Sequence, residues 1–119
     1  MLETRSLKGF MAGFLCMEVF EVEVFPPAVV LRSRDGRFAV EVDGYRVFGR
    51  SDFAWHPLAG YISRRHFAVK RVDGSYYVVD LGSTNGTFVN GVDIRGRGLY
   101  PLKRGDVINV AGVVELVVE

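Results

Sequence analysis

The sequence is poor in cysteine and histidine, and this scarcity excludes two kinds of chemistry. Cys16 is the single cysteine among 119 residues, so no intramolecular disulfide can form, which fits a reducing, cytoplasmic location. The two histidines, His56 and His66, lie far from Cys16 in the sequence, and no spacing typical of a metal site is present. We therefore expect neither a bound metal nor a cofactor.

Long apolar runs and an excess of charge of one sign are also absent. The apolar stretch from Phe10 to Met17 is shorter than the ~20 residues that a membrane-spanning helix needs. It is similar to the core of a signal peptide, but Glu18, Glu21 and Glu23 follow it in place of a cleavage site. The net charge is only +1, and no basic stripe is interleaved with aromatic residues. We expect a soluble protein that binds neither membranes nor nucleic acids.

Helical periodicity is missing as well, because no segment of ten or more residues repeats its apolar side chains with the period of an α-helix. Short runs rich in Val, Phe, Tyr and Ile alternate instead with turn dipeptides such as Asp43-Gly44 and Asp73-Gly74. The predicted strands include Ala28–Ser33, Arg37–Val42, Tyr45–Phe48, His66–Val72, Tyr76–Leu81, Thr87–Val89, Val107–Val110 and Val113–Val118. This pattern predicts an all-β sandwich of two antiparallel sheets with about ten to eleven short strands.

Three further segments are expected to stand apart from this pattern. Ser51 to Ile62 follows neither period and is predicted to be a long loop with at most a single helical turn. Arg95 to Gly98 reads Arg-Gly-Arg-Gly and is predicted to be a flexible excursion. Residues 1–27 are predicted to be an N-terminal extension of a domain that spans residues 28–119.

The N-terminal extension contains one predicted extra strand. Met17 to Phe25 alternates apolar and acidic side chains, as a half-buried strand does, and Pro26-Pro27 ends the run. The extension could add this strand to the domain, link it to a further domain or serve as a dimerisation arm. The sequence leaves these three roles, and the oligomeric state, open.

Three polar segments follow apolar runs in the second part of the chain. They are Gly49-Arg50, Ser63-Arg64-Arg65-His66 and the run from Gly82 to Gly91, which reads Gly-Ser-Thr-Asn-Gly-Thr-Phe-Val-Asn-Gly. Arginine offers a planar fork that matches phosphate oxygens, and Ser and Thr hydroxyls can donate to the same atoms. An Asn side chain can hold an extended backbone through one donor and one acceptor. These residue types predict a recognition site for a phosphate-bearing peptide.

The same segments lack what a nucleotide enzyme or a hydrolase needs. No Lys follows the glycines of the Gly82 to Gly91 run, and a strand is predicted after it where a P-loop would have a helix. No Ser, His and Asp stand in a recognisable nucleophile arrangement. We therefore predict that the protein is not an enzyme. The alternative to phosphopeptide binding is a protein-interaction or self-association module that works without phosphate.

From Ala28 to Glu119 the chain resembles the forkhead-associated (FHA) domain, a phosphothreonine-binding β-sandwich with its binding loops at one end. The resemblance rests on the three polar segments together with a fourth motif, Leu-x-x-Gly-Asp-x-Ile, at Leu102 to Ile108. Each motif alone is weak, but the four in this order are specific. One departure is Ala111, which stands before Gly112 in the last turn and is expected to add a bulge or shift the final hairpin.

The resemblance implies that the chain binds a phosphothreonine-containing protein or peptide, as a signalling or assembly adaptor. The residues that would bind this phosphopeptide are Arg50, Ser63, Arg64, Thr84 and Asn85, and those that would support the site are Gly49, His66 and Gly86. Arg50, Ser63 and Arg64 would face the phosphate. Thr84 would add a hydroxyl or backbone contact beside the phosphothreonine, and Asn85 would hold the backbone of the bound peptide.

Overall fold

The computed structural model describes residues 28–119. The predicted strand Met17–Phe25 and the three roles considered for residues 1–27 lie outside the described residues. The strands are β1 Val29–Ser33, β2 Ala39–Val42, β3 Tyr45–Phe48, β4 Phe67–Val72, β5 Ser75–Asp80, β6 Thr87–Val89, β7 Val92–Asp93, β8 Tyr100–Leu102, β9 Val107–Val110 and β10 Val114–Val118. Two 3₁₀ turns, η1 Arg50–Phe53 and η2 Ala59–Tyr61, lie in the long connection between β3 and β4.

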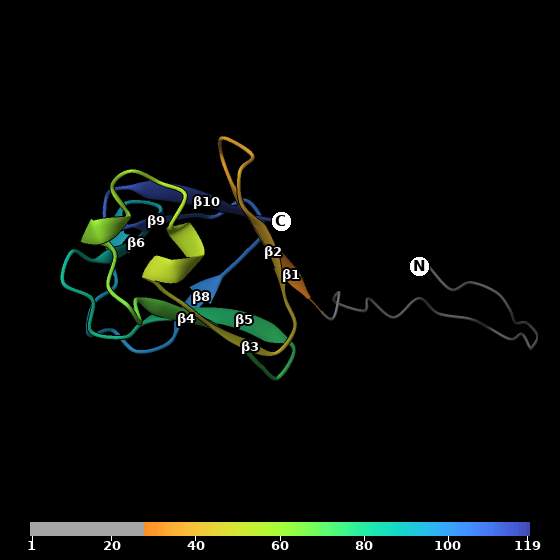
Figure 1. The fold of residues 1–119 in the computed structure, drawn as a ribbon. Helices are drawn as coiled ribbons and strands as arrows, with labels where there is room; N and C mark the ends of the chain where they lie inside the picture. Colours follow the sequence, from red (N-terminus) through yellow and green to blue (C-terminus); the bar gives the residue numbers. More distant parts are fainter. Residues whose placement is uncertain (1–27) are drawn as a thin grey trace, which may run out of the picture.

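These strands form two antiparallel sheets that face each other (Figure 1). One sheet has the order β2-β1-β10-β9-β6-β7, and the other has the order β3-β4-β5-β8. The predicted all-β sandwich is therefore confirmed. The sequence pattern does not predict β7 and β8, because β7 has two residues and β8 contains Pro101. The proline is compatible with β8 because this strand lies at the edge of its sheet, where some N–H groups stay unpaired.

The core lies between the two sheets. Phe48 of β3 and Phe67 of β4 are fully buried and stack with 4.8 Å between their ring centroids. Leu31, Ile108 and Leu116 are buried on the opposite sheet. Burial of each such side chain contributes about 1.5–3 kcal/mol to stability, so the core holds the strand ends that carry the polar loops.

The long connection between β3 and β4 is held against the sandwich rather than extending into solvent. The segment predicted as a loop with a single helical turn contains two, η1 and η2. Phe53 and Ile62 of this connection are fully buried. Trp55 packs edge-on against Phe53, with 6.5 Å between the ring centroids. The connection thus has fixed anchors on either side of its exposed middle.

The hairpin between β9 and β10 accommodates the extra residue Ala111. Ala111 and Gly112 both have positive φ, at 59° and 75°, and the N–H of Val113 donates to the carbonyl of Val110 over 2.9 Å. Positive φ is unfavourable for Ala, and the turn closes nonetheless. The N–H of Ala111 also donates to the carbonyl of Gly86, 2.9 Å away, so this turn contacts the loop after β5.

The described part of the chain shows neither a membrane-spanning helix nor a metal cluster. No helix within residues 28–119 is long and apolar enough to cross a bilayer. In the same range, no group of three or more His, Cys, Asp or Glu side chains is placed to hold a metal ion.

Candidate functional site

The three polar segments of the sequence meet at one end of the sandwich. The N–H of Arg50 donates to the carbonyl of Ser63 over 3.0 Å. The N–H of Thr84 donates to Ser63 Oγ over 3.2 Å. Ser63 therefore joins the end of β3 to the loop that follows β5. The five residues predicted to bind a phosphopeptide come from these joined segments.

The Arg50 side chain is oriented by the backbone but keeps the end of its guanidinium unpaired. Its Nε donates to the carbonyl of Ile62 over 2.8 Å, which fixes the direction of the side chain. Within residues 28–119, neither Nη1 nor Nη2 of Arg50 makes a hydrogen bond or ion pair, and the residue is exposed. This arrangement leaves two guanidinium nitrogens available to an anion.

Ser63 and Arg64 offer further donors beside Arg50. Ser63 Oγ accepts the Thr84 N–H, so its own proton remains available to donate. Arg64 is exposed, and its guanidinium has no hydrogen-bond or ion-pair partner in the described part of the chain. The guanidinium groups of Arg50 and Arg64 and the hydroxyl of Ser63 thus all belong to the connection between β3 and β4.

Gly49 allows these loops to approach closely. A Cβ atom on Gly49 would lie 1.6 Å from the carbonyl oxygen of Arg64 and 3.2 Å from that of Ser63. The φ angle of Gly49 is −160°, an extended conformation open to any residue. The requirement for glycine is therefore steric. Asp52 completes the turn, because its carboxylate accepts the Gly49 N–H over 2.9 Å and an Arg46 nitrogen over 2.7 Å.

His66 is fully buried and connects the segment of Ser63 to the loop after β5. Its Nδ1 accepts the Ser63 N–H over 3.0 Å, and its Nε2 lies 2.8 Å from the carbonyl oxygen of Gly86. Because Nδ1 is an acceptor, the proton resides on Nε2 and the ring is neutral. Burial lowers the pKa of His66, although the bond to Gly86 and the charge of Asp80 act in the opposite direction. These contacts fit the supporting role predicted for His66.

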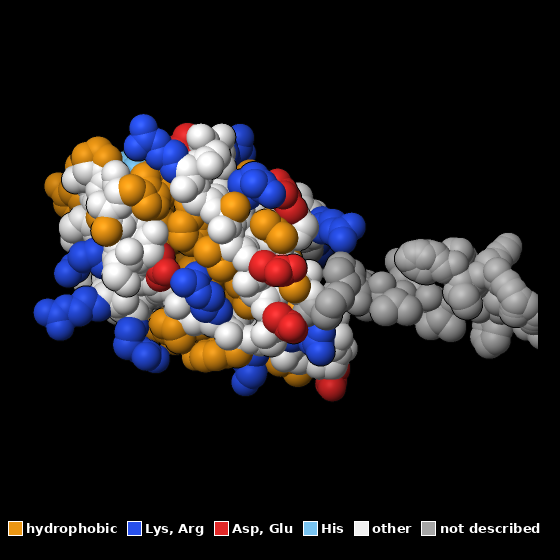
Figure 2. Space-filling view, turned by 45° about the vertical axis from the view of Figure 1, so that its right-hand side comes forward, with side chains coloured by type: hydrophobic (Ala, Val, Ile, Leu, Met, Phe, Trp, Pro, Cys, Tyr) orange, Lys and Arg blue, Asp and Glu red, His pale blue; other side chains and the backbone are white. Residues whose placement is uncertain are grey.

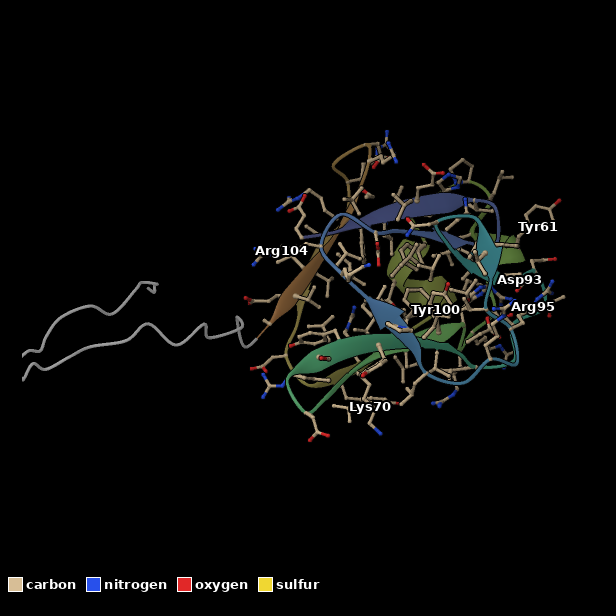
Figure 3. The ribbon with its side chains drawn as sticks, turned by 180° about the vertical axis from the view of Figure 1, so that it is seen from behind. Tyr61, Lys70, Asp93, Arg95, Tyr100 and Arg104 are labelled. Atoms are coloured by element: carbon tan, nitrogen blue, oxygen red, sulfur yellow. The ribbon has the colours of Figure 1, made fainter. Side chains whose placement is uncertain are left out.

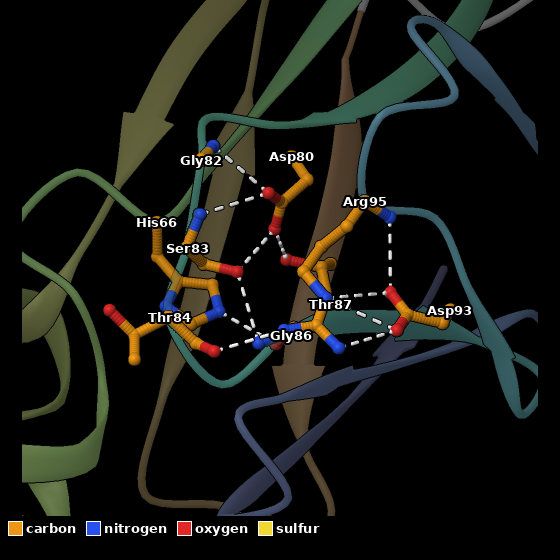
Figure 4. Close-up of polar contacts among 9 residues, drawn as sticks. All are labelled: His66, Asp80, Gly82, Ser83, Thr84, Gly86, Thr87, Asp93 and Arg95. Carbon is orange, nitrogen blue, oxygen red and sulfur yellow. Dashed lines mark hydrogen bonds and ion pairs between the residues drawn. The ribbon is translucent and has the colours of Figure 1, made fainter.

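Asp80, which is not among the predicted site residues, organises the loop after β5 (Figure 4). Its Oδ1 accepts the hydroxyls of Ser83 and Thr87 over 2.5 and 2.6 Å, and its Oδ2 accepts the N–H groups of Gly82 and Ser83 over 2.9 and 3.0 Å. Partial burial acts to raise the pKa of Asp80, but these donors together lower it. A sequence signal did exist, since Asp80 stands two residues before Gly82, and an Asp side chain often accepts the backbone N–H two residues further on.

Asn85 lies at the exposed tip of this loop. Its Nδ2 donates to the carbonyl of Tyr61 over 2.8 Å, which ties the tip to η2. Its Oδ1 has no hydrogen-bond partner among residues 28–119 and can accept an N–H from a bound chain. Gly86 follows with φ of +94°, and a Cβ there would lie 2.9 Å from the Phe88 ring. The tip therefore needs glycine at position 86 for both its conformation and its packing.

Arg95 also contacts this loop, although it lies in the segment predicted to be a flexible excursion. Its Nη1 donates to the carbonyl of Thr84 over 2.9 Å, and its Nη2 lies 2.7 Å from Asp93 Oδ2. The side chain thus has a defined place in the structure (Figure 4). The Gly-rich local sequence did not reveal this partner of Arg95, which lies eleven residues away along the chain.

The site offers hydrogen-bond donors for binding, and two of its titratable side chains, His66 and Asp80, are already engaged within the loops. His66 is fully buried with both ring nitrogens hydrogen-bonded. Both carboxylate oxygens of Asp80 accept hydrogen bonds from the loop. Arg50, Arg64, Thr84 and Asn85 are exposed, and Ser63 is half-buried. This set can bind an anion and an extended peptide next to it.

Known proteins share the fold of this chain. The family model of the FHA domain matches residues 46–111, which is more than half of the chain. One similar structure comes from a study of phosphothreonine-dependent FHA domain interactions. It is 29% identical, has a TM-score of 0.64, and the alignment covers 77% of this chain and 95% of that one.

Two other relatives complete the comparison. The FHA domain of FhaA, complexed with the intracellular domain of Rv3910, is 28% identical with a TM-score of 0.61, over 76% of this chain and 99% of that one. An oxoglutarate dehydrogenase inhibitor from Corynebacterium diphtheriae is 62% identical over 29 residues, which are 24% of this chain and 20% of that protein. That match thus spans only a short part of the curated relative. With a family model that covers the sandwich from β3 to the turn before β10, the chain belongs to the FHA domain family.

Proposed function

We propose that this protein is a phosphopeptide-binding module that recognises phosphothreonine in a partner protein and acts as a signalling or assembly adaptor. The observation that carries the proposal is the pair of unpaired guanidinium nitrogens of Arg50, oriented by the Ile62 carbonyl next to Ser63. A related FHA structure, 29% identical, was studied for phosphothreonine-dependent interactions, which supports the same ligand class. Proteins of this family are interaction modules rather than enzymes, and the proposal assigns no catalytic step to this chain.

Each candidate residue has a defined part in the proposal. A phosphothreonine carries about −1.5 to −2 charges near neutral pH, and charge-assisted bonds from Arg50 and Arg64 would neutralise it. Ser63 would donate its hydroxyl to a phosphate oxygen. Asn85 would accept an N–H of the peptide through Oδ1, and Thr84 would contact the ligand beside it.

The distribution of charge favours an anionic ligand at this end of the molecule. Figure 2 shows Lys and Arg side chains on several parts of the visible surface, and Arg50, Arg64 and Arg65 are exposed at the candidate site. The acidic side chains near the site are already engaged, since Asp52 pairs with Arg46 and Asp93 pairs with Arg95. The guanidinium groups of Arg50 and Arg64 have no acidic partner in the described part of the chain, which favours an anionic ligand although the whole chain carries only +1.

The test is calorimetric titration of the full chain with three versions of one peptide chosen from a phosphothreonine library. The phosphothreonine form should bind with a dissociation constant on the order of micromolar, because a short peptide buries little area and loses freedom on binding. The phosphoserine form should bind more weakly and the unphosphorylated form far more weakly. Equal binding of the phosphothreonine and unphosphorylated forms would support the phosphate-independent alternative instead.

A matched pair of arginine variants completes the test. Arg50→Ala should abolish measurable binding of the phosphothreonine peptide. Arg104→Ala removes the same charge from the opposite end of the molecule (Figure 3), so it should leave binding unchanged. Similar losses in the two variants would indicate general electrostatic attraction rather than a built site.

A further inference from the structure

Arg95 lies at the same end of the molecule as the candidate site. Figure 3 shows Arg95 and Asp93 on the same side of the molecule as Tyr61, whose carbonyl accepts a hydrogen bond from the Asn85 amide. Arg95 comes from the connection that follows β7, so it approaches the loop after β5 from outside the three polar segments. Neither the motifs of the sequence nor the five predicted binding residues include it.

Asp93 holds Arg95 through several bonds. Arg95 Nε lies 3.2 and 3.1 Å from the two carboxylate oxygens of Asp93, and Nη2 lies 2.7 Å from Oδ2. The N–H of Arg95 donates to Asp93 Oδ1 over 3.0 Å. The hydrogen bonds from Arg95 lower the pKa of Asp93, so the pair is charged on both sides at neutral pH. One guanidinium nitrogen, Nη1, is left to point at the Thr84 carbonyl.

The contact of Arg95 with the site loop is close and directional. Nη1 donates to the Thr84 carbonyl over 2.9 Å, as Figure 4 shows. A Cβ atom on Gly86 would lie 3.4 Å from Arg95 Nε. The Arg95 guanidinium therefore packs next to Gly86, where the missing side chain leaves room for it. Both backbone groups of Thr84 are thus occupied, its N–H by Ser63 Oγ and its carbonyl by Arg95.

Fixing both backbone groups of Thr84 limits rotation of the chain that carries Asn85. We propose that Arg95, locked by Asp93, is a positioning residue that holds Thr84 and Asn85 in the orientation that accepts a phosphothreonine peptide. This inference rests on the proposed function of the site. In this proposal Arg95 acts through the Thr84 carbonyl rather than on the phosphate, because each of its three guanidinium nitrogens already donates to Asp93 or Thr84.

A neighbouring arginine provides the control that separates positioning from charge. Arg97 is exposed, lies two residues further along, and its side chain makes no hydrogen bond within residues 28–119. Arg95→Ala and Arg97→Ala therefore remove the same charge from the same connection. Arg95→Ala should weaken peptide affinity about tenfold, the effect of losing one charge-assisted hydrogen bond, whereas Arg97→Ala should change it less than about twofold.

Two further variants test the mechanism. Asp93→Asn keeps an oxygen for the Arg95 N–H but loses the charge that locks the guanidinium, so its affinity should fall between wild type and Arg95→Ala. Arg95→Lys keeps the charge but cannot bond Asp93 and Thr84 through a planar fork, and it should resemble Arg95→Ala. Equal losses in Arg95→Ala and Arg97→Ala, or wild-type affinity in Arg95→Lys, would overturn the proposal.

The second measurement is the ¹H–¹⁵N spectrum of the free full-length protein. Arg95→Ala and Arg95→Lys should shift the Thr84 and Asn85 amide signals and accelerate their exchange with solvent, and Arg97→Ala should do neither. Unchanged Thr84 and Asn85 signals in both Arg95 variants would refute the positioning role. Because this measurement needs no ligand, it tests the positioning role of Arg95 independently of peptide binding. A wild-type chain that bound no phosphothreonine peptide would refute the proposed function, not the effect of Arg95 on the loop.

Discussion

Gly49 lies so close to Arg64 that a Cβ atom on the glycine would sit 1.6 Å from the arginine's carbonyl oxygen. This approach brings the end of β3, which leads into Arg50, directly against the loop that carries Ser63. The two segments are also joined by a hydrogen bond, in which the N–H of Arg50 donates to the Ser63 carbonyl over 3.0 Å. The relative placement of the two arginines at the candidate site therefore depends on the absence of a side chain at position 49.

The close approach predicts opposite outcomes for two glycine variants. Gly49→Ala should destabilise the protein by more than about 2 kcal/mol, because backbone would have to move to admit the methyl group. Gly60 of η2 has no positive φ, and no neighbouring atom lies within 4 Å of the place that an alanine methyl group would take. Gly60→Ala should be neutral or stabilise by up to about 1 kcal/mol, since alanine restricts the unfolded chain. Thermal unfolding of the two variants tests the prediction, which fails if their midpoints agree.

Ligand residues and supporting residues should differ in stability as well as in binding. Arg50→Ala and Asn85→Ala change exposed side chains, so each should alter stability by less than about 0.5 kcal/mol while peptide binding is lost. His66→Ala should lower the melting temperature, because the Ser63 N–H and the Gly86 carbonyl would lose a buried partner. Calorimetry and thermal unfolding measured on the same samples provide the test. If His66→Ala kept the wild-type melting temperature and Arg50→Ala were unfolded, the ligand role of Arg50 and the supporting role of His66 would be reversed.

The neutral state of His66 predicts a pH dependence of stability. The folded-state pKa of His66 is lowered from 6.5, so on acidification the unfolded chain takes up the proton first. The stability that depends on neutral His66 is fully present above the unfolded pKa. It falls by up to about 1.4 kcal/mol per pH unit as pH drops below that value, until the folded-state pKa is reached.

Histidine variants show whether His66 causes this slope. Chemical denaturation between pH 7.5 and 5 should give a steep loss of stability in the wild-type protein and in His56→Gln. His66→Gln should be less stable at pH 7.5 and should show a smaller slope. A slope that persists unchanged in His66→Gln would assign the effect to other groups.

The four bonds to Asp80 predict a large effect of its removal. Asp80→Ala leaves the buried Thr87 and Ser83 hydroxyls without their acceptor, at a cost of about 1–3 kcal/mol for each such group. Asp43→Ala removes a carboxylate from an exposed turn and should be nearly neutral. Because the pKa of Asp80 is lowered on folding, its contribution is present above the unfolded value of 3.8 and is lost as pH falls through the folded value. Urea denaturation at pH 7 compares the two variants, and equal stabilities would contradict the role of Asp80.

Much of the architecture could be predicted from local sequence. Alternating apolar residues and Asp-Gly turns indicated β1 to β6, β9 and β10, because side-chain alternation and turn conformation are properties of a few neighbouring residues. The short strands β7 and β8 were not predicted. The two residues of β7 are too few to show an alternation of side chains, and Pro101 in β8 is unfavourable for a strand. The motifs also indicated which polar loops should meet, and the structure does bring Arg50, Ser63 and Thr84 together.

The sequence by itself determined the sandwich class, the turns and the residue types that the site offers. Only the tertiary structure decided how those loops are held, because it pairs β6 with β9 and so brings Ala111 against Gly86. It likewise places Arg95 on the Thr84 carbonyl, a contact between two segments whose local sequences carry no sign of each other. The tendency to form a strand depends on neighbouring residues. These contacts depend instead on which distant strands share a sheet, and the packing of the whole core determines that pairing.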